Sequence, residues 1–445
     1  MQSRRPFCCA QYYHYVIVGV TFCILLIGAG VRSTPGILTV RIEEETKWDR
    51  GVIGGAIALN TLLYGLLGPF VVTIISKFGL RSVVISSLFC LGISVSVSSQ
   101  MASASTPALL YVLWGFFVGI GSAGTATVLG AIVADAWFFT RRSVVVGLFA
   151  ASNAAGSLIF ATPVAQVAVE FGWRAGVWLM GAAALALVPL AAFFLYNSPT
   201  IIGLKRFGEE VEDVKSDTAV REDNKDGDVV VPGVVVAVVA VASNPFQTVI
   251  LAIIEGFQNR DFCLLAFSFA VCGASTNGLI LTHFVPAATD AGLNEVRAAG
   301  MLTAMGALDI AGTIASGVLT ERFDAKILLS LYYAFRGIAL SFLPSALRLP
   351  SQDSGLWPYA IVYGLDWIAT VPPTKRICDE LFPGRGSLFF GLCLAVHQIG
   401  AAVAAAAGGA VRAHVGTYDH VFWTAAGLCI ITAVSVRYIR ISTSK

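Results

Sequence analysis

The sequence is poor in charge. Asp, Glu, Lys and Arg make up 13% of its 445 residues, the hydrophobic class makes up 56%, and the mean hydropathy is +0.78. A soluble domain of this length cannot bury so much apolar surface in its core. The composition therefore excludes an ordinary soluble protein. It predicts an all-α polytopic membrane protein whose surroundings are the lipid bilayer.

The sequence also lacks the motifs of catalysis and of ATP use. It contains no P-loop, no metal-ligand cluster and no nucleophile elbow, so we expect no enzyme activity, no cofactor and no metal. Transport, if it occurs, must then be driven by gradients. "GIGSAG" at 119–124 fits a dinucleotide-binding pattern, but it lies inside an apolar run, where small residues let helices pack closely. The net charge of +2 does not indicate a nucleic-acid partner.

Long apolar runs follow one another along the chain. A bilayer core of about 30 Å needs about 20 apolar residues per spanning helix. Windows of that length predict twelve transmembrane helices, at 14–40, 50–75, 81–101, 107–134, 143–169, 174–196, 261–288, 296–320, 326–347, 356–377, 386–411 and 420–439.

The twelve runs form two groups of six, which predicts three regions. They are an N-terminal six-helix half at 1–196, a linker at 197–260 and a C-terminal six-helix half at 261–445. The centre of the linker carries charges of both signs and few aromatics, which is typical of disorder. The apolar segment at 229–242 is interrupted by Pro232 and Gly233 and is short for a span, so it suits a lateral amphipathic segment at the membrane surface.

The distribution of positive charge predicts the orientation. With the N-terminus inside, most of the 29 Lys and Arg residues fall in cytoplasmic segments, as the positive-inside rule requires. We therefore expect both termini and the linker in the cytoplasm. The two halves also resemble each other in sequence. The similar stretches "KFGLRSVVIS" at 77–86 and "RFDAKILLS" at 322–330 each follow the second helix of their half. Such internal duplication is typical of transporters.

The chain resembles the major facilitator superfamily at the loop after the second helix. "VTIISKFGLR" at 72–81 keeps Gly79 and Arg81 of the family's loop motif, but it has Val72 and Ser76 where the family has glycine and aspartate. The resemblance implies that this loop, with Lys77 and Arg81, takes part in gating. The missing aspartate puts the usual charge pair of that loop in doubt.

Longer stretches resemble one group within that superfamily, the monocarboxylate porters and oxalate/formate antiporters. They are "WFFTRRSVVVGLFAASNAAGS" at 137–157, "FGWR" at 171–174, "CGASTNGLILTHFVPAATDAG" at 272–292 and "YGLDWIATVPPT" at 363–374. The resemblance implies the major facilitator fold, in which two pseudo-symmetric six-helix bundles rock about a central substrate site.

Ionisable residues inside the predicted spans point to that site. A charge at the centre of an isolated spanning helix costs about 2.5–3.5 kcal/mol on insertion scales, so it normally faces a partner or a wet cavity. Near the middle of predicted helices eight to eleven lie Asp309, Arg336, Asp366 and His397. Two acids, one base and an imidazole at one depth predict a site for protons and an anion.

We assign proton coupling to Asp309, Asp366, His397 and His283, although a lone histidine inside a helix also serves as a packing residue. The resemblance adds that monocarboxylate porters carry a transport-linked acid in helix eight, where Asp309 stands. It also shows a departure, because Thr313 replaces the arginine that follows that acid.

Two arginines are candidate anchors for a substrate carboxylate, because a guanidinium binds it in a bidentate fork. Arg32 lies in "GAGVRSTPG" at 28–36, where Pro35 and three glycines predict an interrupted helix; the alternative is that Arg32 snorkels to the interface. Arg336 binds substrate or, alternatively, holds Asp366 in a static ion pair. Uncharged candidates for substrate contact or for cross-helix hydrogen bonds are Asn60, Tyr64 and Asn277.

A second set of gating candidates lies after the fourth predicted helix. Asp135 is followed six residues later by the pair Arg141 and Arg142. The spacing predicts gate salt bridges between helices four and five. A simple positive-inside signal explains the arginine pair nearly as well.

Together these patterns predict a secondary transporter of the plasma membrane. Its expected partners are a small anionic substrate, most simply a monocarboxylate, and protons, moved together by alternating access. One alternative is export or import of a larger secondary metabolite or a vitamin-like solute. Another is a nutrient sensor built on a transporter fold. The sequence leaves the oligomeric state and the direction of transport open.

Overall fold

The computed structural model describes residues 12–48, 50–101, 107–209, 245–293, 295–349 and 352–441. Within these ranges the chain is helical apart from short connections and one isolated bridge between Phe138 and Phe207. The predicted all-α class is confirmed.

The helices occupy the positions of the twelve predicted spans. The first six positions hold α1 (Tyr13–Thr46); α2 (Arg50–Leu66) with α3 (Gly68–Phe78); α4 (Leu80–Ser98); α5 (Pro107–Leu110), η2 (Tyr111–Phe117), α6 (Val118–Gly124) and α7 (Thr127–Trp137); α8 (Arg142–Phe171); and α9 (Trp173–Phe194). The last six hold α12 (Arg260–Gly273), η6 (Ala274–Ile280) and α13 (Leu281–Asp290); α14 (Glu295–Arg322); α15 (Ala325–Leu347); α16 (Gln352–Asp366) with α17 (Val371–Leu381); α18 (Gly386–Val415); and α19 (Asp419–Ser435) with η7 (Val436–Tyr438). Of the described residues, nine helices are long and apolar enough to cross a membrane, or ten if the bent α2–α3 pair is one span.

The breaks in these helices do not lie where the sequence predicted one. The predicted interruption of helix one is wrong, because α1 runs through Pro35 without a break. Proline removes one backbone donor but does not by itself end a helix inside a membrane, where neighbouring groups can satisfy the freed carbonyl. The chain breaks instead at Thr125 and Ala126, between α6 and α7, and at 367–370, between α16 and α17.

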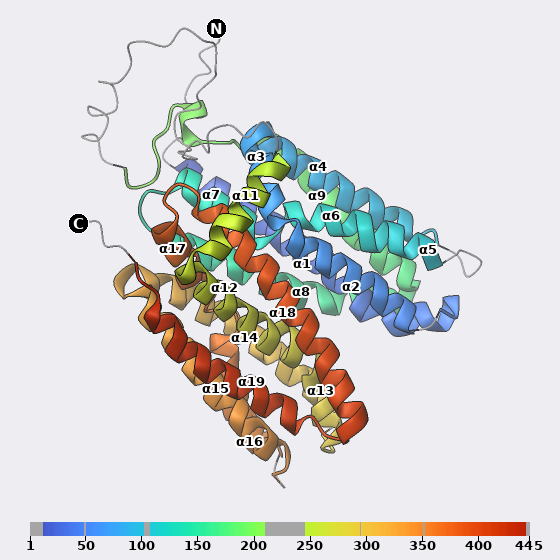
Figure 1. The fold of residues 1–445 in the computed structure, drawn as a ribbon. Helices are drawn as coiled ribbons and strands as arrows, with labels where there is room; N and C mark the ends of the chain where they lie inside the picture. The colour runs from blue at the N-terminus through green and yellow to red at the C-terminus, as the bar shows by residue number, and fades with distance from the viewer. Residues whose placement is uncertain are drawn as a thin grey trace, which may run out of the picture.

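The helices form two groups that pack against each other. Figure 1 shows α1 to α9 gathered on one side of the molecule and α12 to α19 on the other. Between the groups, α8 packs on α14, and α18 packs on α2 and α3. The approach of α8 to α14 is close enough to require glycine, because a Cβ on Gly317 would lie 2.7 Å from the Ser143 carbonyl oxygen.

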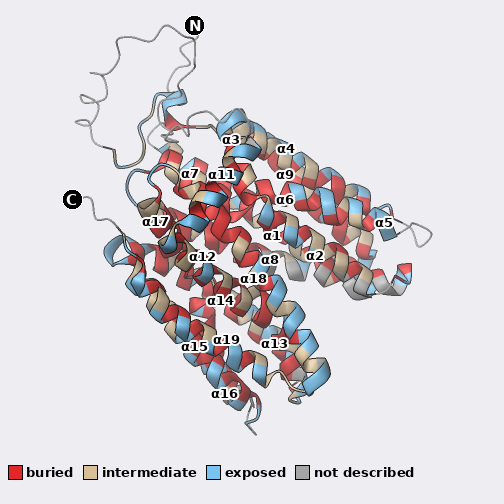
Figure 2. Ribbon diagram, viewed as in Figure 1, coloured by how far each residue is buried: buried red, intermediate tan, exposed pale blue. Residues whose placement is uncertain are grey.

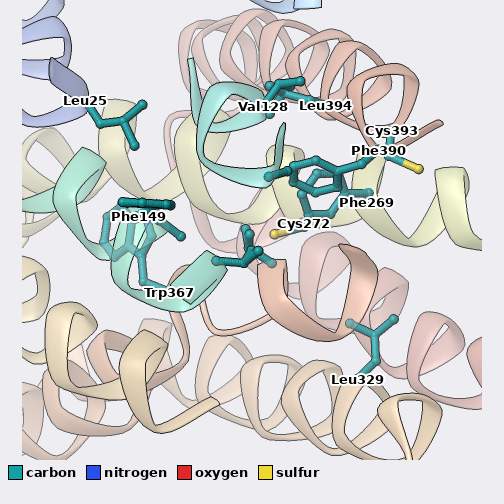
Figure 3. Packing of buried hydrophobic residues seen from close by; sticks show 14 of the residues in the cluster. Leu25, Val128, Phe149, Phe269, Cys272, Leu329, Trp367, Phe390, Cys393 and Leu394 are labelled. Carbon is teal, nitrogen blue, oxygen red and sulfur yellow. The ribbon is translucent and has the colours of Figure 1, made fainter. Parts of the chain in front are cut away.

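One cluster of buried apolar side chains includes residues of both groups. Figure 3 shows Val128 of α7 beside Leu394 of α18 within this cluster. Figure 2 shows buried positions where helices meet and exposed positions on the outer faces of the bundle. Many large apolar side chains are exposed there, Phe193 and Phe342 among them, as expected of a surface that faces lipid.

The described part of the predicted linker range contains two short helices. They are η3 (Pro199–Ile202) and α11 (Pro245–Gln258). α11 contacts both groups, since Phe246 stacks on Phe70 of α3 at 5.7 Å between ring centroids and Glu255 pairs with Arg385 before α18. The charged linker centre and the apolar segment 229–242 lie outside the described residues, and the region boundaries at 196 and 261 stay predictions. We call the end of the bundle that holds 137–142 and 195–209 the linker end, and the opposite end the far end.

Candidate functional site

The first polar cluster lies between α1, α2, α7 and α8. We call it the Arg32 cluster, and its members are Arg32, Tyr64, Thr127 and Asn153. The Arg32 guanidinium lies over the Tyr64 ring, with 3.9 Å from Cζ to the ring centroid, and donates to Asn153 Oδ1. Asn153 Nδ2 in turn donates to Thr127 Oγ1 at 3.1 Å and to Tyr64 Oη at 3.4 Å. The structure therefore brings together two of the predicted substrate-binding residues, Arg32 of α1 and Tyr64 of α2.

The charge of Arg32 has no carboxylate to balance it within the described part of the chain. Its contacts there are the Tyr64 ring and the Asn153 amide, and its side chain is only half-buried. A cation over an aromatic face is held by the ring quadrupole without being neutralised. Arg32 therefore keeps a net positive charge that is available to an anion.

The second cluster lies between α12, α14, α15 and the break that follows α16. We call it the Arg336 cluster, and its members are Cys272, Ser275, Asp309, Arg336 and Asp366. Arg336 is fully buried, and its Nε donates to Asp366 Oδ2 at 2.7 Å. The predicted contact between Arg336 and Asp366 is confirmed.

The other donors of Arg336 are also occupied. Nη2 donates to the carbonyls of Asp366 at 2.6 Å and of Trp367 at 3.0 Å. These carbonyls are free because α16 ends at Asp366, and a helix C-terminus attracts a cation. Nη1 reaches Cys272 Sγ at 3.1 Å and Ser275 Oγ at 3.4 Å. With all three nitrogens engaged, Arg336 has little capacity left for a substrate carboxylate.

Asp309 differs from Asp366 because no cation contacts it in the described structure. Its Oδ1 accepts hydrogen bonds from Thr313 Oγ1 and from the Ile368 backbone N–H, both at 2.8 Å. Its Oδ2 is buried and has no partner among the described residues. Thr313, which replaces the arginine expected from the resemblance, therefore hydrogen-bonds this acid without neutralising it.

The remaining predicted site residues have mostly structural contacts. His283 Nε2 lies 2.9 Å from the Ala405 carbonyl, and its ring packs on Tyr418. Asn60 Nδ2 donates to the Trp114 carbonyl at 3.1 Å, which is the cross-helix alternative. The side chain of Asn277 is half-buried, with no hydrogen bond to another described residue. His397 packs on Phe269 at 4.9 Å between ring centroids, and its Nδ1 is buried without a described partner.

At the linker end, a lysine joins the two groups of helices. Lys375 of α17 is 2% exposed, and its Nζ lies 3.0 Å from Asp135 Oδ2 of α7 and 2.6 Å from Asp379 Oδ1. Ser387 Oγ of α18 also donates to Asp135 Oδ2 at 2.6 Å. We call these four residues the Lys375 gate. Beside it, the Ser143 backbone N–H of α8 donates to Glu321 Oε1 of α14 at 2.7 Å.

The predicted partners of Asp135 were different. Arg142 Nε donates to the Phe138 carbonyl at 2.7 Å, and Arg141 is exposed in a left-handed conformation, so neither forms the expected pair with Asp135. Lys77 is exposed and lies over its neighbour Phe78. Arg81 lies over the Tyr196 ring. The role of Lys375 was not predicted from the sequence, because a lysine near the end of a spanning helix is already explained by the positive-inside rule.

These clusters and the gate lie in a chain with clear relatives. The sequence profile of the Major Facilitator Superfamily matches residues 20–389. The chain belongs to the Major Facilitator Superfamily. It is accordingly a membrane transporter and not an enzyme, and its two groups of helices adopt the fold of that superfamily.

Several relatives of the chain within the superfamily carry transporter names. "Monocarboxylate transporter 12-B" of Danio rerio is 25% identical over 87% of this chain and 77% of its own length. "Monocarboxylate transporter 13" of Rattus norvegicus is 25% identical over 78% of this chain and 70% of its own. "Putative niacin/nicotinamide transporter NiaP" of Bacillus subtilis is 29% identical over 34% of this chain and 33% of its own.

Solved structures of the superfamily share the fold. The proton:xylose symporter XylE, bound to 6-bromo-6-deoxy-D-glucose, superposes with a TM-score of 0.71 at 11% identity and 98% coverage of both chains. A single-site variant of the E. coli fucose:proton symporter FucP superposes with a TM-score of 0.64 at 15% identity, covering 96% of this chain and 100% of its own. At such identities the likeness concerns the fold alone.

Among the described residues, the ion pairs at the far end stay within each group of helices. Glu45 of α1 pairs with Arg174 of α9, and Asp290 of α13 pairs with Arg412 of α18. The hydrogen bond that Arg174 donates lowers the pKa of the Glu45 carboxyl below its usual value. The described ion pair from α7 to α17 lies at the linker end, so the polar contacts between the groups are concentrated there.

Proposed function

We propose that this protein is a proton-coupled transporter of a small organic anion, most simply a monocarboxylate, that works by alternating access. The observation that carries the proposal is the uncompensated charge of Arg32 at the interface of four helices. Relatives that are named monocarboxylate transporters support the substrate class. The expected location is the plasma membrane, with both termini in the cytoplasm.

Arg32 is the better anchor for the carboxylate. It is half-buried, and its only described partners are an aromatic ring and an amide, both of which a carboxylate can replace or supplement. Arg336, in contrast, is enclosed and donates to five groups on three segments. We assign substrate binding to Arg32 with Tyr64, and a structural role to Arg336.

Asp309 is the better carrier of the proton. The Arg336 cluster contains two buried carboxylates but one guanidinium, so it holds one excess negative charge when both acids are ionised. Because Asp366 is paired with Arg336, the excess falls on Asp309, whose Oδ2 has no described partner. A proton on Asp309 removes this charge, and an anion on Arg32 removes the opposite charge in the other group. The loaded transporter is then nearly neutral inside and can reorient.

The direct test is uptake of labelled L-lactate into proteoliposomes of the purified protein, with and without an inward proton gradient. The proposal predicts that the gradient stimulates uptake. Asp309→Asn should abolish this stimulation while exchange of lactate across the membrane persists, and Arg32→Gln should raise the lactate KM at least about tenfold. Glu170→Gln, a change of an exposed acid on α8, is the matched control. Unstimulated uptake by folded wild-type protein would contradict proton coupling.

A second candidate is transport of a vitamin-like solute, which the local match to a putative niacin/nicotinamide transporter favours. Nicotinamide is neutral and nicotinate is an acid of similar shape. Uptake of both solutes by the same proteoliposomes distinguishes the two candidate functions, because an Arg32 anchor strongly favours nicotinate, the acid. Equal uptake of the two would support the second candidate.

A further inference from the structure

Two thiols that the proposed function does not use lie in contact near the linker end. Cys378 of α17 and Cys393 of α18 are both fully buried, and their sulfurs are 4.0 Å apart. The described cysteines are all free thiols. Figure 3 shows Cys393 within the buried apolar cluster that includes residues of both groups of helices. Two thiols at this distance can form a disulfide once their sulfurs approach by about 2 Å.

The thiol pair lies between two contacts that join the groups of helices at the linker end. Cys378 is one turn after Lys375, whose ammonium group joins α17 to α7. Cys393 follows Gly391, where α18 lies so close to the first group that a Cβ would be 3.2 Å from the Cα of Pro69 in α3. Both cysteines therefore belong to elements of the second group that contact the first group here.

The position of α17 relative to its neighbours depends on packing more than on a continuous helix. α17 begins after the break at 367–370, and residues 382–385 connect it to α18. A break at the end of a helix is a place where a hinge motion can occur. A disulfide between Cys378 and Cys393 adds a covalent link from α17 to α18. With this link in place, α17 can no longer turn about the break when Lys375 leaves α7.

We propose that Cys378 and Cys393 form an oxidation site, at which a hydroperoxide converts the two thiols into a disulfide and thereby stops transport. Both sulfurs are inaccessible to solvent while the linker end is closed, so the oxidant reaches them when that end opens. The proposed orientation places the linker end in the cytoplasm, where disulfides are usually transient and catalytic or redox-sensing. The inference goes beyond the proposed function, which involves neither thiol.

The reaction at this site needs a hydroperoxide and no other reactant. Cys378 lies in the last turn of α17, whereas Cys393 lies about two turns into α18, so Cys378 is nearer to the linker end. The Cys378 sulfur attacks one peroxide oxygen, an S–O bond forms, the O–O bond breaks, and water leaves with the thiol proton. The Cys393 sulfur then attacks this sulfenic acid, an S–S bond forms, the S–O bond breaks, and a second water leaves. The two sulfurs together lose the two electrons that the peroxide gains.

The test treats proteoliposomes with hydrogen peroxide, blocks the remaining thiols, and measures by mass spectrometry the peptide that links Cys378 to Cys393. Wild-type protein should accumulate the linked peptide, and lactate uptake should fall in proportion to the linked fraction. A dithiol reductant should break the bond and restore uptake. Lys375→Gln, which opens the linker end, should form the linked peptide about 5- to 150-fold faster.

Three variants show whether the inhibition belongs to this pair. Cys378→Ala and Cys393→Ala should each keep their uptake in peroxide, because one thiol of the pair alone cannot form the bond. Cys263→Ala is the matched control. Its thiol lies near the start of α12 and donates to the Phe257 carbonyl at 3.4 Å, so its loss should change neither the linked peptide nor the inhibition.

The outcomes separate this inference from the proposed function. If folded wild-type protein forms no linked peptide in peroxide, the oxidation site is refuted. Full uptake by linked protein, or inhibition that persists in both alanine variants of the pair, overturns its effect on transport. Equal rates of linkage in wild-type protein and Lys375→Gln would show that opening of the linker end does not control the reaction. If untreated protein transports no lactate, the proposed function fails, and the linked peptide still decides whether the oxidation site exists.

Discussion

At the scale of the residue, burial explains why a carboxylate stands in the apolar run that ends α16. Asp366 pairs with Arg336, and Arg336 in turn binds the carbonyls left free where that helix ends. The carboxylate and the guanidinium satisfy each other's charge and hydrogen bonds in a region from which water is excluded. The cost of burying either charge alone is what holds the pair together.

Removal of one partner should therefore damage stability before it damages transport. Asp366→Asn leaves the Arg336 guanidinium buried without its countercharge, and losses of this kind amount to about 3–5 kcal/mol. We expect a clear fall in the melting temperature of the detergent-solubilised protein. The double variant Arg336→Met with Asp366→Asn should recover part of the loss. An unchanged melting temperature together with an altered lactate KM would instead make the pair part of the substrate site.

A second residue-scale prediction concerns pH at the far end. Because Arg174 lowers the pKa of Glu45 in the folded protein, the ionised carboxyl stabilises the fold. This contribution is fully present above the ordinary glutamate value of 4.5 and is lost as the pH falls through the lower folded value. Melting temperatures of wild-type protein should therefore exceed those of Glu45→Gln at pH 7. The difference should vanish in strong acid, and a gap that persisted there would show that the ion pair is not its source.

At the scale of the element, apolar run length predicted the helices well, because the thickness of the bilayer fixes it. The breaks inside the runs were not predicted. Pro35 lies within continuous helix, whereas the chain opens at Thr125 and Ala126 without any proline. Hydropathy averages over a window and carries no information on which carbonyls find partners. The pair of Arg336 and Asp366 could be predicted because both charges lie in the middle of apolar runs. The contact between Lys375 and Asp135 could not, because Lys375 lies near the end of a run, where a charge is common.

The element-scale prediction concerns α7, α17 and α18. In Lys375→Gln, Asp135 and Asp379 face each other without the cation between them, so the closed linker end is destabilised. We expect the alkylation rate of the buried Cys378, one turn from Lys375, to rise about 5- to 150-fold. Asp135→Asn in the same chain should return part of the protection because it removes one of the two like charges. Lys205→Gln, which changes an exposed lysine at the same end, is the matched control. If Cys378 is alkylated equally fast in Lys375→Gln and in Lys205→Gln, Lys375 does not hold the linker end closed.

At the scale of the whole molecule, the two groups of helices meet along α8 and α14, and under the proposed alternating access we expect this contact to hold the linker end closed. Gly317 brings α14 against the Ser143 carbonyl, next to the Lys375 gate. In Gly317→Val the added methyl groups have no space while the linker end is closed, and such overpacking costs about 1–3 kcal/mol. The cost falls on the closed state alone, so the equilibrium should shift by about 5- to 150-fold toward the state that opens there. Gradient-driven lactate uptake should fall and Cys378 alkylation should rise together. Gly19→Val in α1, where no atom lies within 4 Å of the new Cβ, is the control for loss of a helical glycine. If Gly317→Val is folded and changes neither uptake nor alkylation, the two groups do not separate along α8 and α14, and alternating access in this protein must use a different hinge.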